Sequence, residues 1–546
     1  MNTTPISQPR PPAPSPQPPA PHLSSWLATH KGFCLLLGLA LLTRLYYLTG
    51  QNFWYDEVYS LNVSNQSWVE NIRLAAGDMH PPLFYLVLKV WAAVAGQSVA
   101  GLRVLTVGLS LGILMLSYLI ARRIASERAA LLMTGFLVLS AHQVYFAQEV
   151  RMYTLVTVFS LAAALAYRYW FESEQGHLPA ILVYILCGVG GMYTHYFGML
   201  IVAALNVHFA LAVFQSWQRS RNLELWKPRL MTWVRAQVAI GLLFAPWVPI
   251  FLFQARRGQP WRSPTPPLEA AFNVLVFIKE AVIGCASELI DLGQVFIHGV
   301  GHFGLYGYVL VYYAAGGTLI LVALLIALGL SARSFVKAEE KQYFAAIVFL
   351  VPLAVAFWVS LRQSIHLSRY LIIITPYLFL LVAMALDRLP RRWMVWGAGS
   401  IVCLVLTLGL VRYYRMPERD TDLRPVFAAI QAQAQPGDKI VIDPDYDDIV
   451  LMFYAPQYGL QDALIKAEYR PRSQGQILKM REHPEVRQWW VILDYHSQWF
   501  ASKGFDTNFS VVSEQSFGGQ YPRARLLKVI PVASAAAVQS QQVLNE

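Results

Sequence analysis

The chain has 546 residues, of which 56% are hydrophobic and 14% are charged, and its formal net charge is +11. Ordinary soluble domains carry about 25% charged residues, so this composition excludes that class and predicts a polytopic membrane protein. The basic residues cluster in short loops between apolar runs, which is typical of an oriented membrane protein rather than of a nucleic-acid-binding protein.

Residues 1–30 are polar and rich in proline, which predicts a disordered cytoplasmic tail without a cleavable signal sequence. Apolar runs of about 17–25 residues, the length that crosses a bilayer as a helix, begin after this tail. We expect about eleven spans, at roughly 31–49, 103–122, 129–146, 154–171, 179–194, 197–215, 235–254, 305–330, 343–360, 369–388 and 393–412. Together, 31–412 form the predicted transmembrane module.

Four loops rich in arginine and lysine give the orientation. They are 121–128, 216–232, 332–341 and 388–392. All four fall on one side if consecutive loops are separated by an even number of spans, and the positive-inside rule assigns that side to the cytoplasm. The run 80–98 is short and begins with two prolines, so we interpret it as an interfacial helix within a long first outer loop, 50–102.

The composition changes after about residue 413, where charge rises and long apolar runs stop. The segments 439–444, 488–495 and 523–530 have the apolar character of buried strands, and a helix is expected from about residue 421. We therefore predict a small extracytoplasmic α/β domain over 413–531, followed by a polar tail over 532–546.

The stretch FWYDEVYS (53–60) places two adjacent carboxylates, Asp56 and Glu57, just beyond the first span. Ionisable residues at a membrane boundary are costly unless they have a partner or a function. One interpretation is a general base or an electrostatic partner for a substrate. The other is a solvated acid pair beside aromatic interfacial anchors.

Two further motifs place polar side chains at outer helix ends. HPPLFY (80–85) begins with His80, which is either a hydrogen-bonding residue at a helix start or a substrate contact. AQEVRMY (147–153) lies at the junction of two spans and forms either a substrate pocket or a local Glu–Arg pair. Its polar residues are Gln148, Glu149, Arg151 and Tyr153.

Arginines at two other outer helix ends are candidate phosphate contacts. ARRGQPW supplies Arg256 and Arg257, and HLSRYL supplies Arg369 beside Tyr370. A guanidinium offers a fixed fork of donors that suits phosphate oxygens. Contact with lipid headgroups, or snorkelling in the case of Arg369, is the alternative.

Several familiar sites are missing from the sequence. The acidic stretch DPDYDD (443–448) lacks the glycine and glutamate that an EF-hand requires, and we interpret it as a solvated loop. The chain has no P-loop, no GxGxxG motif opening a helix, no HExxH and no Cys/His cluster, so no nucleotide or zinc site is predicted. The four cysteines have no CxxC spacing and read as core or lipid-facing residues.

Taken in order, WYDE, HPPLFY, ARR, QEVRMY and SRY resemble the polyprenyl-phosphate-sugar-dependent glycosyltransferases of the GT-C fold. The nearest branch contains protein O-mannosyltransferases and bacterial aminoarabinose transferases. The resemblance is strongest over 31–200 and extends to 412. It implies that Asp56 occupies the catalytic acid position, with Glu57 beside it, and His80 falls where aminoarabinose transferases have a lysine.

This resemblance implies transfer of a sugar from a polyprenyl-phosphate carrier, with inversion, to a lipid, glycan or protein acceptor outside the cytoplasm. Asp56 would act as the base, and arginines, with or without a divalent cation, would neutralise the departing phosphate. The expected partners are this donor, its acceptor and membrane lipids, in a bacterial plasma membrane. A polyprenyl-lipid transporter or flippase, and a non-catalytic scaffold, are the alternatives.

Overall fold

The computed structural model describes residues 30–173, 177–221, 224–258, 264–284, 320–334, 337, 340–363, 367–415, 422–443, 448–464, 480, 483, 485–494, 509–517 and 524–532. The predicted tails at the two ends of the chain lie outside this part, except for His30 and Val532. Most of the predicted acidic loop 443–448 also lies outside it.

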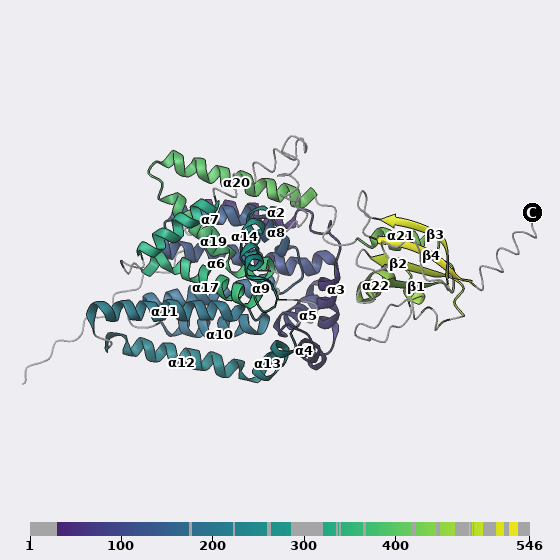
Figure 1. The fold of residues 1–546 in the computed structure, drawn as a ribbon, viewed down its shortest axis with the longest axis horizontal. Helices are drawn as coiled ribbons and strands as arrows, with labels where there is room; N and C mark the ends of the chain where they lie inside the picture. Colours follow the sequence, from purple (N-terminus) through teal and green to yellow (C-terminus); the bar gives the residue numbers. More distant parts are fainter. Residues whose placement is uncertain are drawn as a thin grey trace, which may run out of the picture.

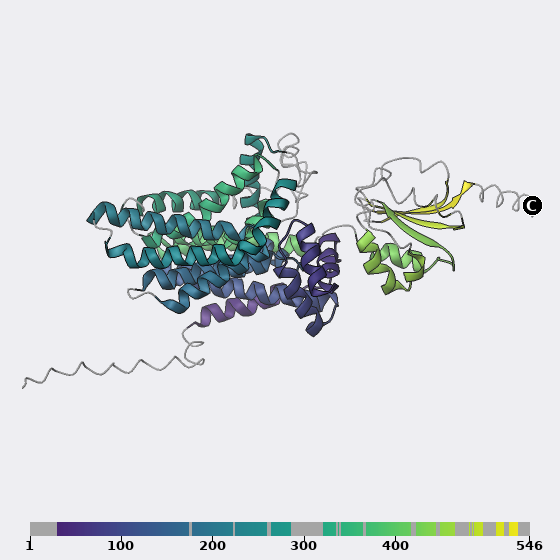
Figure 2. The same cartoon turned by 90° about the horizontal axis from the view of Figure 1, so that it is seen from below.

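Helices packed side by side make up most of the molecule (Figure 1, Figure 2). The long elements of this bundle are α2 (Lys31–Leu45), α6 (Val99–Ile124), α7 (Glu127–Leu139), α8 (Ala141–Ala147), α9 (Tyr153–Glu172), α10 (Leu178–Thr194), α11 (Gly198–Ser220), α12 (Lys227–Phe244), α14 (Pro267–Ile283), α17 (Glu340–Ser360), α19 (Thr375–Asp387) and α20 (Arg392–Arg415). Shorter pieces connect them: η1 (Glu224–Trp226), η2 (Ala245–Trp247), α13 (Val248–Arg257), α18 (Leu367–Tyr370) and η4 (Leu371–Ile374).

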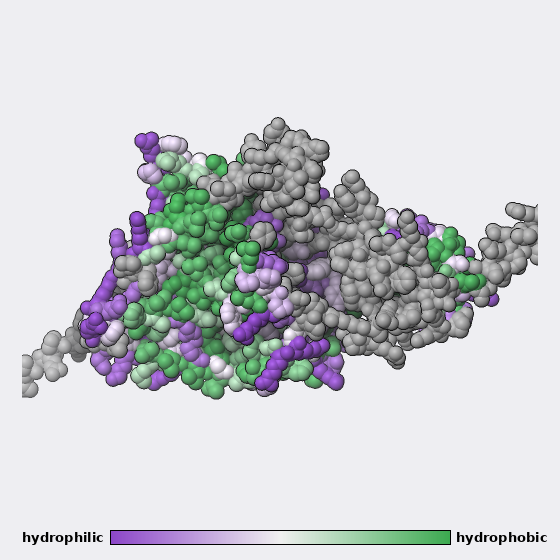
Figure 3. Space-filling model, viewed as in Figure 1, coloured by the Kyte–Doolittle hydropathy of each residue, from purple (hydrophilic) through white to green (hydrophobic). Residues whose placement is uncertain are grey.

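The length and composition of these helices suit a membrane. Six helices of the described chain are long and apolar enough to cross one, and α7 with α8 forms a further candidate that is bent by 62°. Figure 3 shows a hydrophobic surface over the bundle, with hydrophilic residues gathered at its left end. The chain is therefore an integral membrane protein, as its composition predicts. The number of spans, for which we expect about eleven, stays a prediction.

Three short helices lie together at one end of the bundle (Figure 1, Figure 2). They are α3 (Tyr55–Asn65), α4 (Trp68–Gly77) and α5 (Leu83–Ala95), and we call this the α3 end. The 13 residues of α5 span about 20 Å at 1.5 Å per residue, less than the roughly 30 Å of a hydrocarbon core. This length agrees with the interpretation of residues 80–98 as a segment that does not cross the membrane.

The C-terminal part forms a separate α/β unit beside the α3 end (Figure 1). Its elements are α21 (Arg424–Gln431), β1 (Lys439–Asp443), α22 (Asp448–Tyr454), η6 (Ala455–Tyr458), η7 (Gln461–Ala463), β2 (Trp489–Asp494), β3 (Phe509–Phe517) and β4 (Ala524–Pro531). The strand order is β1-β2-β4-β3, in which β1 and β2 are parallel and the other neighbours antiparallel. Three strands match the predicted ones, while β3 was not predicted.

Buried apolar residues of β1 and β2 form the core of this unit. Ile440, Ile442 and Ile492 are almost completely buried, as are the two tryptophans of β2. The register places Ile442 opposite Ile492, so that these side chains occupy the same face of the sheet. By contrast, β3 is an edge strand with mostly exposed side chains.

Candidate functional site

The first turn of α3 carries both acids of the FWYDEVYS stretch. Trp54 has an extended backbone and caps the helix, which begins at Tyr55. Asp56 and Glu57 therefore lie in the first turn, where the free N–H groups of a helix favour negative charge. Successive helical residues point about 100° apart, so the two carboxylates reach different surroundings.

Glu57 is completely buried and paired with a buried arginine of α6. Arg103 Nε lies 3.2 Å from Glu57 Oε1, and Arg103 Nη2 lies 2.9 Å from Glu57 Oε2, which is the bidentate fork geometry. The amide of Val150 also donates to Glu57 Oε1, at 2.9 Å. These contacts hold the Glu57 carboxylate against α6 and Val150, away from the arginines that face Asp56.

Asp56 faces two other arginines. Its Oδ2 lies 3.4 Å from Arg369 Nη1 and 3.7 Å from Arg151 Nη2. Arg151 also donates to the Asp56 carbonyl at 3.1 Å and to Ser60 Oγ at 2.9 Å, so the arginine is fixed against α3. Both guanidinium groups meet the same carboxylate oxygen, and Oδ1 forms no hydrogen bond or ion pair with another described residue. Asp56 is 21% exposed, which leaves it accessible to a ligand.

Arg369 is the more accessible of the two arginines. Its side chain is 28% exposed, against 4% for that of Arg151. The Arg369 guanidinium also lies over the ring of Trp54, 5.6 Å from its centroid. The structure thus brings together Asp56, Arg151 and Arg369, three residues predicted from motifs that are far apart in the sequence.

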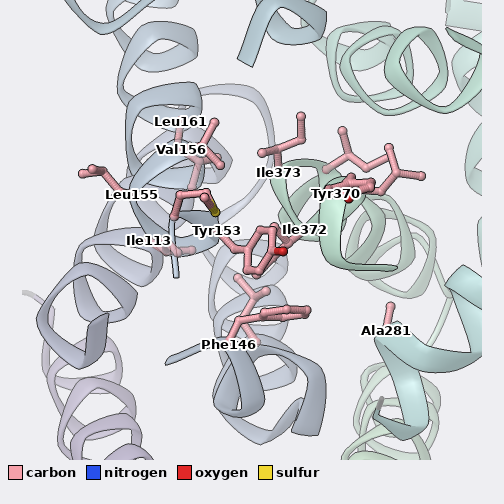
Figure 4. Close-up of a cluster of buried hydrophobic side chains, with 14 of the residues drawn as sticks. Ile113, Phe146, Tyr153, Leu155, Val156, Leu161, Ala281, Tyr370, Ile372 and Ile373 are labelled. Carbon is pink, nitrogen blue, oxygen red and sulfur yellow. The ribbon is translucent and has the colours of Figure 1, made fainter. Parts of the chain in front are cut away.

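Aromatic rings cover one side of this cluster. The rings of Tyr153 and Tyr370 lie 6.4 Å apart, and Phe146 is 5.2 Å from Tyr153. Figure 4 shows the Tyr153 ring next to Phe146 and Ile372, within the buried apolar packing between α9 and η4. Tyr153 and Tyr370 are therefore wall residues of the site, consistent with the predicted binding role.

A histidine that the sequence did not single out joins this aromatic wall. The ring of His195 lies 5.1 Å from Tyr370 and 5.3 Å from His80. Its Nδ1 accepts a hydrogen bond from the Phe197 amide, 3.1 Å away. Burial, together with the charge of Arg151, lowers the pKa of His195 to about 3. His195 is therefore neutral at pH 7, and its Nε2 carries the proton.

A close helix approach places His195 in this position. His195 lies in the turn between α10 and α11, where Gly198 contacts the backbone of Gly191. A Cβ on Gly198 would lie 2.6 Å from the Gly191 carbonyl carbon, so only glycine allows this packing. No motif marks His195 in the sequence, and only the turn brings it near His80.

Asp78 is a third carboxyl group of the site and was also missed. It caps the C-terminal end of α4, two residues before His80. Burial raises the pKa of Asp78, while the nearby guanidinium of Arg151 opposes this shift. Asp56 and Tyr59 also act on its pKa, which places Asp78 beside the Asp56 cluster. The sequence feature that could have pointed to Asp78 is its position two residues before the HPPLFY motif.

Glu149 and Gln148, the acid and the amide of the AQEVRMY motif, lie in different surroundings. Glu149 is buried and interacts electrostatically with both Arg151 and Arg369, so it belongs to the site. Gln148 instead connects α2 with α20. Its Nε2 donates to the Arg44 and Tyr46 carbonyls, each at 2.8 Å, and its Oε1 accepts from the Tyr413 hydroxyl at 2.6 Å. These contacts support a structural role for Gln148.

Arg256 and Arg257 lie apart from this cluster. Both are exposed at the C-terminal end of α13. Arg257 Nη1 donates to the Gly77 carbonyl at the end of α4, 3.0 Å away. No contact within the described chain joins either arginine to Asp56. The structure therefore gives Arg257 a helix-capping contact in place of the predicted pairing of the two arginines at one phosphate site.

The described residues include no group of three or more His, Cys, Asp or Glu side chains that could hold a metal ion. Arg151 acts on both Asp56 and Asp78. The divalent cation left open by the sequence thus gains no ligand set from this part of the chain.

No family model and no curated protein matches the sequence. Solved structures do match over nearly the whole chain. The crystal structure of ArnT from Cupriavidus metallidurans bound to undecaprenyl phosphate is 12% identical, with a TM-score of 0.53, over 93% of this chain and 98% of that chain. The same protein in the apo state gives 13% identity and a TM-score of 0.54.

A second match is the archaeal oligosaccharyltransferase AglB from Archaeoglobus fulgidus, in complex with an inhibitory peptide and a dolichol-phosphate. It is 10% identical, with a TM-score of 0.51, over 86% of this chain and 70% of that chain. At sequence identities this low, the structural matches establish that the fold is shared and nothing more. The GT-C fold predicted from the order of the motifs is thereby confirmed.

Proposed function

We propose that this protein is a membrane glycosyltransferase that moves a sugar from a polyprenyl-phosphate carrier to an acceptor on the extracytoplasmic side. The observation that supports this most strongly is the asymmetric environment of Asp56. Arg151 and Arg369 meet its Oδ2, whereas Oδ1 forms no hydrogen bond or ion pair with another described residue. The matched ArnT structure holds undecaprenyl phosphate, and that of AglB holds a dolichol-phosphate.

In this proposal Asp56 Oδ1 accepts the proton of an acceptor hydroxyl or amine group. The acceptor atom forms a bond with the anomeric carbon, the bond from that carbon to the phosphate oxygen breaks, and the phosphate leaves with the electron pair. A single displacement of this kind inverts the anomeric centre. The carboxylate supplies general-base assistance, for which about 10²–10⁴-fold in rate is typical.

The departing phosphate needs positive charge that is already in place. Arg369 meets this need better than Arg151, because it is partly exposed and presents a planar fork of donors. Trp54 and Asp56 hold the guanidinium in position before the donor binds. Glu149, Asp78, His80, Tyr153 and Tyr370 shape the pocket around the sugar and the acceptor.

The location of the site follows from the charge of the loops. The cluster lies at the α3 end, opposite the end that carries the basic loops 121–128 and 216–232 (Figure 1). The positive-inside rule puts those loops in the cytoplasm, and hence Asp56 and the C-terminal domain outside it. A donor lipid in the outer leaflet then brings its phosphate to the height of Arg369.

The test is sugar transfer by Asp56→Asn in membranes of cells that lack the native protein. Mass spectrometry of envelope glycolipids and glycoproteins should show the product with wild type and almost none with the variant. Asp462→Asn removes an exposed carboxyl group of η7 and serves as the control. Near-normal transfer by folded Asp56→Asn would refute the proposal. Movement of labelled undecaprenyl phosphate across vesicles without a new glycosidic bond would favour the transporter alternative.

A further inference from the structure

Residues 51–53, which lead into α3, are held by Arg103 of the helix α6. Its guanidinium donates to the Gln51 carbonyl at 2.9 Å and to the Asn52 carbonyl at 3.0 Å. It also lies over the Phe53 ring, 5.1 Å from the centroid. The same side chain forms the ion pair with Glu57, so Arg103 fixes both the residues that precede α3 and the first turn of this helix.

The C-terminal domain also holds this segment. The Tyr454 hydroxyl accepts a hydrogen bond from the Phe53 amide at 2.9 Å and donates one to the Phe53 carbonyl at 3.0 Å. The Phe53 ring stacks on Phe453, with 5.5 Å between the centroids. A third contact joins Arg424 Nη2 to the Gly50 carbonyl at 3.0 Å.

The two hydrogen bonds of Tyr454 satisfy groups that nothing else in the described chain satisfies. Phe53 is completely buried and precedes the helix cap, so its amide and carbonyl take no part in the hydrogen bonds of α3. Buried backbone groups without partners cost free energy, which favours this docked arrangement. Burial raises the pKa of Tyr454, so the phenol stays protonated and can donate and accept together.

We propose that Tyr454 is a positioning residue, which fixes Phe53 and thereby the first turn of α3, so that Asp56 keeps its alignment with the acceptor. The C-terminal domain is then a part of the active site rather than an appendage. The kinetic side of this inference depends on the proposed function. Its structural side, the control of the segment 50–57 by a residue 401 positions away, does not.

The first test compares Tyr454→Phe with Tyr458→Phe. Both tyrosines stack on Phe427, at 5.9 Å and 5.8 Å, but the Tyr458 hydroxyl has no hydrogen-bond partner in the described chain. Tyr454→Phe should lower kcat for sugar transfer about ten- to a hundredfold, with the donor KM nearly unchanged, because misplacing a reacting group by about 1 Å costs up to about 10²-fold. Tyr458→Phe should behave as wild type. Equal kcat values for the two variants would overturn the positioning role.

The second test is hydrogen–deuterium exchange of the segment 50–57 in lipid nanodiscs, which needs no activity. In Tyr454→Phe the Phe53 amide loses the hydroxyl oxygen that accepts its hydrogen bond, so its exchange should become about tenfold faster. In Tyr458→Phe its exchange should be unchanged. If Tyr454→Phe folds poorly, Arg424→Gln removes the neighbouring bond to Gly50 and should speed exchange in the same segment. Unchanged exchange in either folded variant would contradict the inference. Loss of transfer activity in all proteins, wild type included, would instead count against the proposed function.

Discussion

Asp56 and Glu57 are neighbours in the chain, yet their carboxylates contact different arginines. Glu57 forms a buried, bidentate pair with Arg103 of α6, whereas Asp56 meets Arg151 and Arg369 and remains partly exposed. This division separates a carboxylate that is tied to α6 from one that stays partly accessible.

Replacing Glu57 should mainly destabilise the protein. Glu57→Gln leaves Arg103 charged and buried without its counter-ion, a loss of the order of 3–5 kcal/mol for a buried pair. The apparent melting temperature in lipid nanodiscs should therefore fall clearly. The control is Glu514→Gln, whose partner Arg525 lies on an exposed part of the sheet and whose loss should cost at most about 1 kcal/mol. Equal melting temperatures for the two variants would contradict the role assigned to Glu57.

Removing Arg369 should impair catalysis more than removing Arg256. Arg369→Gln loses the charge that faces the departing phosphate and should lower kcat/KM for the donor by about 10²–10³-fold, as loss of a transition-state donor does. Arg256→Gln removes an exposed arginine outside the cluster and should change the rate little. The measurement is initial-rate kinetics with a purified undecaprenyl-phosphate-linked sugar. A larger effect of Arg256→Gln would indicate that the phosphate is bound at Arg256 rather than at Arg369.

Asp78 should make the stability depend on pH. Burial raises its pKa in the folded state above the unfolded value of about 3.9, so the folded protein binds this proton more tightly. The stabilisation is complete at pH values below the unfolded pKa and is lost as the pH rises through the raised, folded pKa. Wild type should therefore lose melting temperature relative to Asp78→Asn as the pH rises above the unfolded pKa of about 3.9 and through the raised pKa of the folded state.

The matched control for Asp78→Asn is Asp462→Asn, in which the replaced carboxyl group is exposed. Its melting temperature should follow that of wild type across the whole pH range. A constant difference between wild type and Asp78→Asn would show that the Asp78 carboxyl does not bind its proton more tightly in the folded state.

Gln148 should matter for stability rather than for turnover. Gln148→Leu leaves the Arg44 and Tyr46 carbonyls and the Tyr413 hydroxyl without this partner, at about 1–3 kcal/mol for each buried group that stays unsatisfied. Tyr413→Phe removes only one of these bonds and should cost less, about 1 kcal/mol. Thermal unfolding measures both changes. A reduced kcat for folded Gln148→Leu, at unchanged melting temperature, would support the substrate-binding role predicted for Gln148 from the sequence.

Much of the fold could be predicted because it depends on local patterns. Apolar runs long enough for a membrane give α6, α9, α11, α17 and α20, whose bounds differ by a few residues from the predicted spans. Short apolar runs, typical of buried strands, predicted β1, β2 and β4 in the same way. The strand β3 escaped prediction because it is an exposed edge strand, and its sequence FSVVSEQSF has no continuous apolar face.

The sequence by itself determined that this is a membrane protein, approximately where α6, α9, α11, α17 and α20 lie, and that Asp56, Arg151 and Arg369 lie near helix ends. Only the tertiary structure decided that Glu57 belongs to Arg103, that Arg257 caps α4, that Asp78 and His195 join the site, and that Tyr454 holds Phe53. The physical reason is that hydrophobicity and helix length are properties of neighbouring residues, whereas each of these assignments is a contact set by how whole helices and domains pack. A side chain's partner is fixed by the direction in which its helix presents it, and no local pattern records what lies there.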